Sequence, residues 1–157
     1  MIDRIWAGWR SEYVGSPGEA GDGCVLCQVL EEGSHVVWRG ERAAVVLNAY
    51  PYTSGHVMVL PVRHVGELEA LDVDETGDVW SAMTDAVRAI KAAYSPDGLN
   101  LGANLGRVAG AGVPGHFHVH CLPRWSADTN FMTAVAEARV LPEALDVTLE
   151  KLRKAWP

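Results

Sequence analysis

Short apolar segments separated by turn residues divide the first part of the chain into predicted strands. Two apolar segments, His35 to Arg39 and Arg42 to Leu47, flank a Gly40-Glu41 pair and predict two strands joined by a tight turn. A Pro-containing loop from Asn48 to Ser54 follows, and Gly55 to Pro61 then predicts a third strand. The pattern therefore indicates a β-sheet early in the chain.

Between Gly66 and Tyr94 the apolar positions change to helical spacing. Asp72 to Glu75 has the D-x-x-E form of a capping box, which predicts a helix start at this point. The Ser95-Pro-Asp-Gly98 stretch predicts the end of the helix in a turn. The helix carries one apolar stripe that we expect to face the core: Val79, Met83, Ala86, Val87 and Ile90.

Two further strands and a terminal helix complete the predicted elements. Leu99 to Gly106 predicts a strand, with a histidine-rich strand after it in antiparallel orientation, and Pro142 to Trp156 predicts a helix with Pro142 in its first turn. The predicted fold class is α+β: an antiparallel sheet of about five strands with one long helix packed on it and a C-terminal helix.

We expect one domain over residues 1–157, since this length suits a single core. Residues 24–125 form its core and residues 126–157 a C-terminal extension that includes the helix. Residues 1–23 form an N-terminal segment, whose aromatic residues we expect to pack onto the domain or a partner subunit.

Charge and composition narrow the choice of partners. A formal net charge of −7 without a basic run argues against a general nucleic-acid binder, although a small nucleotide needs only local donors. No apolar segment is long enough to span a bilayer, and the first residues lack the apolar core of a signal peptide. Three cysteines, two of them in a C-x-x-C, suit a reducing compartment, so we expect a cytoplasmic protein.

Candidate chemistry is concentrated between Gly110 and Trp125. His116, His118 and His120 alternate with apolar residues, so a β-strand would direct all three imidazoles to one face. The glycine-rich loop before them lets backbone N–H groups approach an anion closely, which favours chemistry at phosphorus. The histidine spacing alone does not distinguish a nucleophile from a metal ligand.

The sequence HFHVHCLP resembles the signature of the histidine triad (HIT) superfamily of nucleotide hydrolases and transferases. The similarity also includes Cys24 to Cys27, Leu47 to His64 and Leu101 to Trp125, and so spans roughly residues 4–132. PRW and Asp128 to Phe131 resemble the branch with bacterial diadenosine tetraphosphate phosphorylases and hydrolases. The resemblance implies a HIT-like fold, a homodimer, and an adenine nucleotide or dinucleoside polyphosphate substrate.

The resemblance also assigns roles to residues. His118 would attack the α-phosphate and form a nucleotidyl-histidine intermediate, with its other nitrogen held as N–H by a backbone carbonyl. His120 would face the scissile phosphate, and His116 would anchor the strand. Nucleotide and phosphate contacts would come from Asn48, Asn104, Gly110, Ala111, Gly112 and Val113.

Three nearby residues have less specific expected roles. We expect His56 to be structural or to support the catalytic residues rather than to react. Arg124 is a candidate contact for the distal phosphates of a long substrate. Trp125 serves either packing or substrate contact.

The C-x-x-C at Cys24 and Cys27 is by itself a redox pair, half of a zinc site or two buried thiols. In zinc-containing relatives of the HIT superfamily, the corresponding cysteines join two histidines, which in this chain are His64 and His116. The resemblance therefore implies a structural zinc ion on these four residues. No organic cofactor is expected.

The resemblance leaves the reaction open in two respects. The acceptor is either phosphate or water, and the alternatives to dinucleoside polyphosphate cleavage are a purine nucleoside phosphoramidase or AMP-ester hydrolase, and a zinc-stabilised nucleotide-binding protein with incidental turnover. Hint- and Fhit-like proteins carry Gln and then Ser or Thr before the triad, whereas this chain has Gly112 and Val113. This difference predicts mainly backbone contacts to phosphate and favours the diadenosine tetraphosphate branch.

Overall fold

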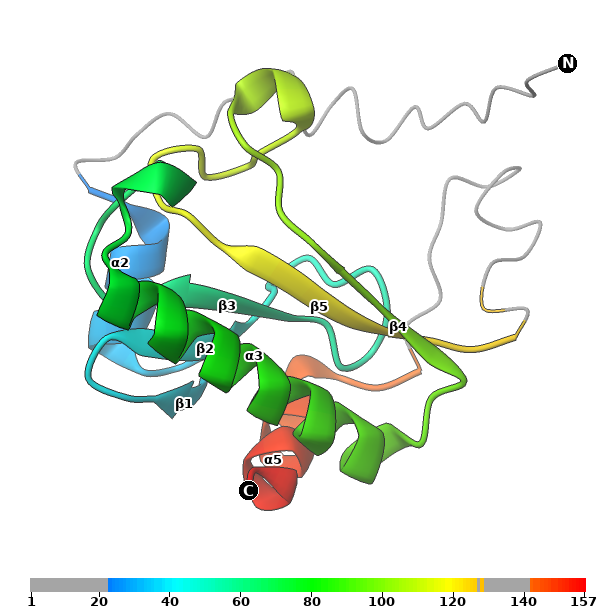
Figure 1. Cartoon of the computed structure of the whole chain (residues 1–157). Helices are drawn as coiled ribbons and strands as arrows, with labels where there is room; N and C mark the ends of the chain where they lie inside the picture. The colour runs from blue at the N-terminus through cyan, green and yellow to red at the C-terminus, as the bar shows by residue number, and fades with distance from the viewer. Residues whose placement is uncertain (1–22, 127, 129–141) are drawn as a thin grey trace, which may run out of the picture.

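The computed structural model describes residues 23–126, 128 and 142–157 (Figure 1). Its strands are β1 (Val36–Arg39), β2 (Ala43–Leu47), β3 (Val57–Pro61), β4 (Gly98–Gly102) and β5 (Val119–Arg124). Its helices are α2 (Val25–Glu32), α3 (Val73–Tyr94) and α5 (Leu145–Ala155), with short 3₁₀ turns η1 (Leu68–Ala70) and η2 (Arg107–Ala109).

The five strands form one antiparallel sheet in the order β1-β2-β3-β5-β4. The hairpin β1–β2 pairs Arg39 with Ala44, and β2 continues onto β3, where Val45 lies opposite Val59. The order then departs from the chain sequence: β5 lies between β3 and the edge strand β4 and pairs with both. The predicted α+β class and the antiparallel arrangement of the last two strands are confirmed.

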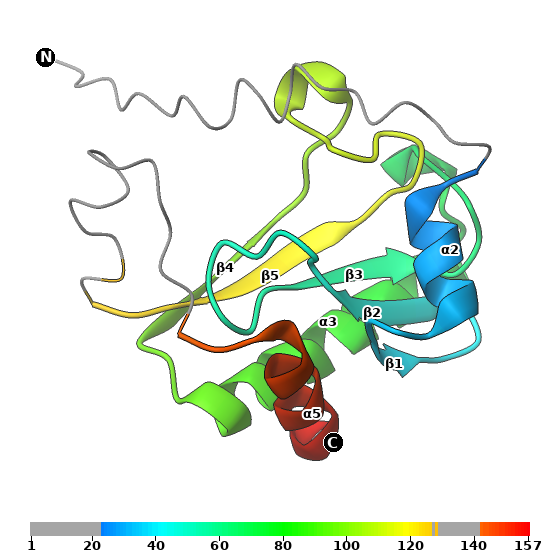
Figure 2. The same ribbon diagram turned by 180° about the vertical axis from the view of Figure 1, so that it is seen from behind.

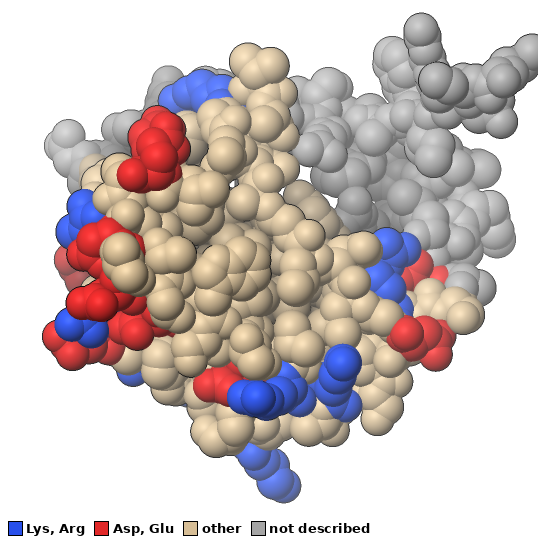
Figure 3. All heavy atoms as spheres, in the orientation of Figure 1, with Lys and Arg blue, Asp and Glu red and all other residues tan. Residues whose placement is uncertain are grey.

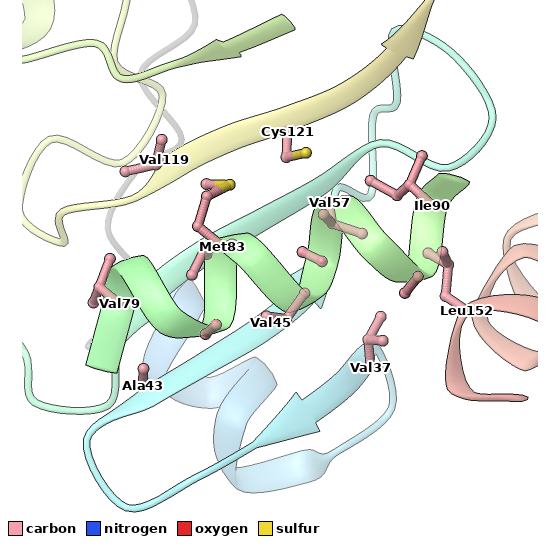
Figure 4. Close-up of a cluster of buried hydrophobic side chains, with 14 of the residues drawn as sticks. Val37, Ala43, Val45, Val57, Val79, Met83, Ile90, Val119, Cys121 and Leu152 are labelled. Carbon is pink, nitrogen blue, oxygen red and sulfur yellow. The ribbon is translucent and has the colours of Figure 1, made fainter. Parts of the chain in front are cut away.

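Helices cover both faces of this sheet, as the two opposite views show (Figures 1 and 2). On one face α3 crosses the strands and α5 packs beside it, and together they enclose the larger apolar core. Figure 4 shows this core, in which Met83 and Ile90 of α3 lie near Val57 and Cys121 of the sheet. On the other face, α2 covers β2 through Leu26 and Leu30.

Helix α3 begins with the predicted capping box. The Asp72 carboxylate accepts from the Glu75 N–H at 2.7 Å, and the Asp72 N–H donates to Glu75 Oε2 at 3.0 Å. The buried Glu75 carboxylate also receives two bonds from the Arg63 guanidinium, at 2.6 and 2.7 Å. The start of the helix is thus tied to the segment that follows β3.

The structure corrects several predicted boundaries. The terminal helix begins at Leu145, so Pro142 precedes it; the Glu143 carboxylate accepts there from the hydroxyls of Tyr94 and Thr148. Strand β4 ends at Gly102, where it pairs with His120, rather than at Gly106. Helix α2 was not predicted at all.

Some expectations lie outside the described residues. These are the packing of the aromatic residues in 1–22 and most of the Asp128 to Phe131 motif, of which the structure describes Asp128 alone. None of the helices in the described ranges is both long and apolar enough to cross a membrane.

Candidate active site and metal cluster

The three alternating histidines do not all lie in a strand, contrary to the prediction. Strand β5 begins at Val119, so only His120 belongs to it, while His116 and His118 lie in the segment leading into it. The pairing with β3 stops at Val59–Val119, close to Pro61, which has no N–H to continue a ladder. The apolar residues between the histidines do turn to the core as expected, since Phe117, Val119 and Cys121 join the cluster under α3.

A backbone carbonyl determines which nitrogen of His118 is available for reaction. His118 Nδ1 lies 2.8 Å from His116 O, and because a carbonyl only accepts, Nδ1 must carry the hydrogen. The lone pair of the neutral ring is then on Nε2. Burial lowers the pKa of His118, which favours this neutral form. The predicted carbonyl contact to the candidate nucleophile is therefore present.

His120 lies beside His118 and is joined to a further histidine. The ring centroids of His118 and His120 are 5.1 Å apart with the rings nearly perpendicular. His120 Nδ1 lies 3.0 Å from His56 Nε2. Burial, and then the neighbouring His118, lower the pKa of His120 to about 4, so this ring is neutral at pH 7. His56, buried just before β3, supports His120 directly.

The four residues implied as metal ligands form a compact cluster. The ligand atoms of Cys24, Cys27, His64 and His116 all lie within 4.8 Å of one another. His116 Nδ1 is 3.4 Å from Cys24 Sγ and 3.6 Å from Cys27 Sγ, and His64 Nδ1 is 3.5 Å from Cys27 Sγ. Bond lengths of about 2.3 Å to sulfur and about 2.0 Å to nitrogen place neighbouring ligands of a tetrahedral zinc about 3.5 Å apart. Three of the ligand pairs therefore have the separation that a tetrahedral zinc requires.

A second contact fixes the orientation of His116 within this cluster. Its Nε2–H donates to Pro61 O at 2.9 Å, which leaves the Nδ1 lone pair facing the sulfurs. The backbone carbonyl of His116 in turn accepts the hydrogen bond from His118 Nδ1. His116 thus connects the metal cluster to the candidate nucleophile through one residue of backbone.

The loop before the histidines packs closely against the segment after β3. Phe117 N–H donates to Val65 O at 2.7 Å. A Cβ atom on Gly66 would lie 3.0 Å from Pro114 O and 3.3 Å from Gly115, which is tighter than ordinary contact. Glycine at position 66 therefore permits the close approach that places the loop.

The other candidate phosphate and nucleotide residues have contacts within the chain. Asn104 Nδ2 donates to Gly110 O at 3.2 Å, where Gly110 adopts a left-handed φ of 91°. Asn48 Oδ1 accepts from the Tyr50 N–H at 2.9 Å, which is an Asx turn. The amides of Asn104 and Asn48 therefore stabilise the loops in which they lie. Ala111, Gly112 and Val113 belong to the loop between Gly110 and the histidines.

Arg124 and Trp125 are also engaged. The Arg124 guanidinium binds both carboxylate oxygens of Asp128, at 2.6 and 2.8 Å, and Asn100 Oδ1 at 2.8 Å. Trp125 packs edge-on against Tyr94. These contacts give both residues a structural role at the end of β5.

A large apolar hollow lies away from the imidazoles. Its volume is about 270 Å³, and Phe117 and Val119 line it from the face opposite the histidines. Trp80, Leu101 and Leu105 line it as well and are about half exposed. Figure 3 shows the face with α3 and β4 as a wide uncharged area with acidic residues gathered at one side.

Comparison with known proteins agrees with this geometry. The family model for the HIT domain matches residues 29–127. The chain belongs to the HIT family. This HIT protein is 36% identical to an AP-4-A phosphorylase of Mycobacterium tuberculosis over 99% of its own length and 85% of that protein.

Solved HIT structures have the same fold. A hypothetical histidine triad nucleotide-binding protein of Sulfolobus tokodaii superposes with a TM-score of 0.70 at 28% identity, covering 84% of this chain and 91% of that one. A zinc-bound HIT protein of Mycobacterium smegmatis gives a TM-score of 0.69 at 25% identity over 85% of this chain and 92% of the other. The expected HIT-like fold is confirmed.

The sequence did not indicate every residue that shapes this HIT site. The direct contact of His56 with His120, the Pro61 carbonyl that orients His116, and the helix carrying Cys27 all emerge from the structure. A signal for that helix was present in the sequence, since Leu26 and Leu30 are four residues apart in the segment VLCQVL.

Proposed function

We propose that this HIT protein cleaves a dinucleoside polyphosphate of the diadenosine tetraphosphate type at its α-phosphate, through a nucleotidyl-His118 intermediate. The observation that carries this proposal is the bond from His118 Nδ1–H to His116 O, which leaves the Nε2 lone pair of a neutral ring available as nucleophile. The 36% identity to an AP-4-A phosphorylase along nearly the whole chain supports the substrate class.

The proposed reaction has two displacement steps. His118 Nε2 forms a bond to the α-phosphorus, the bond from this phosphorus to the bridging oxygen breaks, and the released nucleotide takes the electron pair. The positive charge on His118 is shared with Nδ1–H, which points at the His116 carbonyl. Phosphate or water then attacks the same phosphorus and frees His118. The phosphates rest on the backbone of the Gly110, Ala111, Gly112 and Val113 loop, and Asn48 contacts the ribose.

Product analysis tests this proposal. Diadenosine tetraphosphate is incubated with the protein, with and without inorganic phosphate, and the nucleotides are separated by chromatography. ADP and ATP formed only with phosphate support a phosphorylase, whereas AMP and ATP in plain buffer support the same α-phosphate attack with water as acceptor. Two molecules of ADP without added phosphate, or intact substrate in both cases, would contradict the proposal.

Two variants separate catalysis from binding. His118→Gln should lose turnover by a factor of about 10⁴ or more while still binding nucleotide, because the lone pair that attacks phosphorus is removed. His35→Gln is the matched control, since His35 contacts Ser34 at the sheet edge and lies outside the site. A nucleotide-binding protein without real catalysis would show no difference between these variants.

We also propose that the cluster of Cys24, Cys27, His64 and His116 holds a structural zinc ion. The separations of 3.4 to 3.6 Å between ligand atoms, and the His116 Nδ1 that faces the two sulfurs, support this assignment. A bound zinc ion would link the start of α2, the segment after β3 and the triad loop. Its role would be structural and not that of a Lewis acid at phosphate. Free cysteines such as Cys24 and Cys27 are typical of a reducing compartment, which supports a cytoplasmic location.

A homodimer through the edge of β4 is part of this proposal. Among the residues that the structure describes, β4 pairs with β5 alone, and half-exposed Trp80, Leu101 and Leu105 line one apolar hollow that includes part of β4. Leu101→Glu should convert a dimer to a monomer in light scattering, whereas Val147→Glu on α5 should not. A wild-type protein with the mass of one chain would contradict the dimer.

A further inference from the structure

The loop between β2 and β3, residues 48–56, carries Asn48, the proposed ribose contact. The Asn48 N–H donates to His56 O at 3.1 Å, which closes the loop at its base. The Thr53 hydroxyl donates to Pro123 O at 3.1 Å and so ties the loop to β5. The position of Asn48 therefore depends on how the rest of this loop is held.

Ser54, in the same loop, has a buried hydroxyl. The residue is 7% exposed, and its Oγ has no hydrogen-bond partner in the part of the chain that the structure describes. A buried polar atom without a partner costs free energy, and folded proteins seldom contain one. The space beside Ser54 is therefore the place to look for a partner.

A small cavity lies there, between the loop and the start of α5. The volume open to the centre of a water molecule is about 10 Å³, which is the room that a single water needs. Three residues with hydroxyl or carboxylate groups line it, namely Ser54, Glu143 and Thr148. His56 lines it as well, but its ring nitrogens are engaged elsewhere. Figures 1 and 2 both place this loop beside the segment that leads into α5.

Glu143 and Thr148 both have hydrogen-bonding capacity to spare. A carboxylate offers about four lone-pair positions. The hydroxyls of Tyr94 and Thr148 donate to Glu143 Oε1 and the Lys151 ammonium donates to Oε2, so one position on Oε2 remains. The Thr148 oxygen has used its hydrogen on Glu143 and still accepts. The cavity wall therefore offers two acceptors, and Ser54 offers a donor.

These three groups match the bonding of one water molecule. We propose that an internal water occupies this cavity and joins Ser54 of the loop to Glu143 and Thr148 of the C-terminal extension. The water donates one hydrogen to the Glu143 carboxylate and the other to the Thr148 oxygen, and it accepts the Ser54 O–H. Three hydrogen bonds are the usual number for a buried water, and the Ser54 hydroxyl then has its partner.

The water makes Ser54 a positioning residue for Asn48. Glu143 is held by Tyr94 of α3 and by two residues of α5, and these helices pack on each other. The bridge therefore connects the loop to two packed helices, in addition to its bond to β5. This consequence for substrate binding rests on the proposed function, in which Asn48 contacts the ribose. The water itself does not depend on that function.

Thermal unfolding of Ser54→Ala tests the water by the sign of the change. With a water in the cavity, the variant removes one of its three bonds, and Tm should fall by about 2–4 °C. In a dry cavity the same change would remove a buried, unpaired hydroxyl, so an unchanged or higher Tm would overturn the inference. Ser81→Ala, at an exposed position of α3, is the matched control and should not lower Tm, because Ala is the better helix former.

A crystal structure and a double-mutant cycle test which residues share the water. The wild-type crystal should show a water oxygen within about 3.2 Å of Ser54 Oγ, and a dry site there would overturn the inference. Thr148→Val keeps the shape of the side chain but removes its oxygen. Ser54→Ala and Thr148→Val each remove a bond to the same water, so the double variant should lose less Tm than the sum of the two losses. Fully additive losses would contradict a shared water.

Nucleotide binding tests the positioning role. Ser54→Ala should weaken AMP binding by about threefold to tenfold in calorimetry and raise KM for diadenosine tetraphosphate by a similar factor, with kcat within about twofold. A ribose contact acts equally in the ground state and the transition state, which is why KM should change and kcat should not. A lower Tm with the AMP affinity of wild type would refute the positioning role. The expected water and Tm changes in a protein that leaves every polyphosphate intact would sustain the bridge and refute the proposed function alone.

Discussion

The ion pair between Arg63 and Glu75 fastens the start of α3 to the segment that carries His64 and Gly66. Arg63 Nε and an NH₂ group bind the two carboxylate oxygens at 2.6 and 2.7 Å, and the same guanidinium donates to Ala70 O. Replacing Glu75 with Gln preserves the shape and a cap acceptor but removes the charge. We expect this variant to lower the free energy of unfolding at pH 7.

The structure provides the size of this effect. The bonds from Arg63 and the Asp72 N–H lower the pKa of Glu75 from 4.5 to about 2, which corresponds to about 3 kcal/mol of interaction free energy. Because the Arg63 side chain is 54% exposed, solvent screens the pair, and about 2 kcal/mol is the expected cost of Glu75→Gln. For a chain of 157 residues this lowers Tm by about 4–8 °C.

The pH dependence has a definite sign. A carboxylate with a folded pKa below its unfolded value stabilises the protein fully above the unfolded value, and the stabilisation declines as pH falls toward the folded value. The difference between wild type and Glu75→Gln should therefore be constant above pH 4.5 and decrease between pH 4.5 and about 2. Urea unfolding at several pH values measures this difference directly.

A second ion pair on the same helix is the matched control. Arg88 and Asp85 are 2.7 Å apart, but their side chains are 66% and 30% exposed, so Asp85→Asn should cost less than about 0.5 kcal/mol. A cost for Glu75→Gln as small as that of the control, or one that does not change between pH 6 and pH 3, would refute the argument.

Three further predictions concern the metal cluster, the triad loop and the core. Cys27→Ser should reduce bound zinc, measured by mass spectrometry of the metal, by about tenfold or more, whereas Cys121→Ala, a buried thiol outside the cluster, should retain it. Gly66→Ala should lower kcat/KM about tenfold, because its Cβ would press on Pro114 O at 3.0 Å; Gly77→Ala, with open space around it in α3, should instead raise stability by about 0.5–1 kcal/mol. Ile90→Ala, at a fully buried position, should cost about 3 kcal/mol in urea unfolding, and a cost below about 1 kcal/mol would contradict the core assignment.

Local patterns predicted the elements whose causes are local. The capping box at Asp72 and Glu75 lies where the D-x-x-E pattern placed it, and the apolar stripe of α3 faces the sheet. The hairpin of β1 and β2 follows the two apolar segments on either side of Gly40. The candidate metal ligands were named from the sequence by resemblance, and the structure brings all four of them together.

Boundaries that depend on a neighbouring strand were wrong for the same reason. The alternation from His116 to Cys121 predicts a strand, but the ladder needs a partner, and β3 ends at Pro61, which has no N–H. Strand β4 ends at Gly102 because its pairing with β5 stops there at His120. Hydrophobic pattern reports which face a residue prefers and contains no information on where a partner strand ends.

The sequence by itself determined the residue types of the site, because the alternation of His116, His118 and His120 and the C-x-x-C are set by spacing along the chain. Only the tertiary structure decided how these groups differ. The hydrogen position on His118 depends on the His116 carbonyl, and the surroundings of His120 depend on His56, which lies 64 residues before it in the chain. Chemically identical side chains acquire distinct roles from the backbone groups that folding places beside them, and hydrogen bonds of this kind have no pattern in sequence.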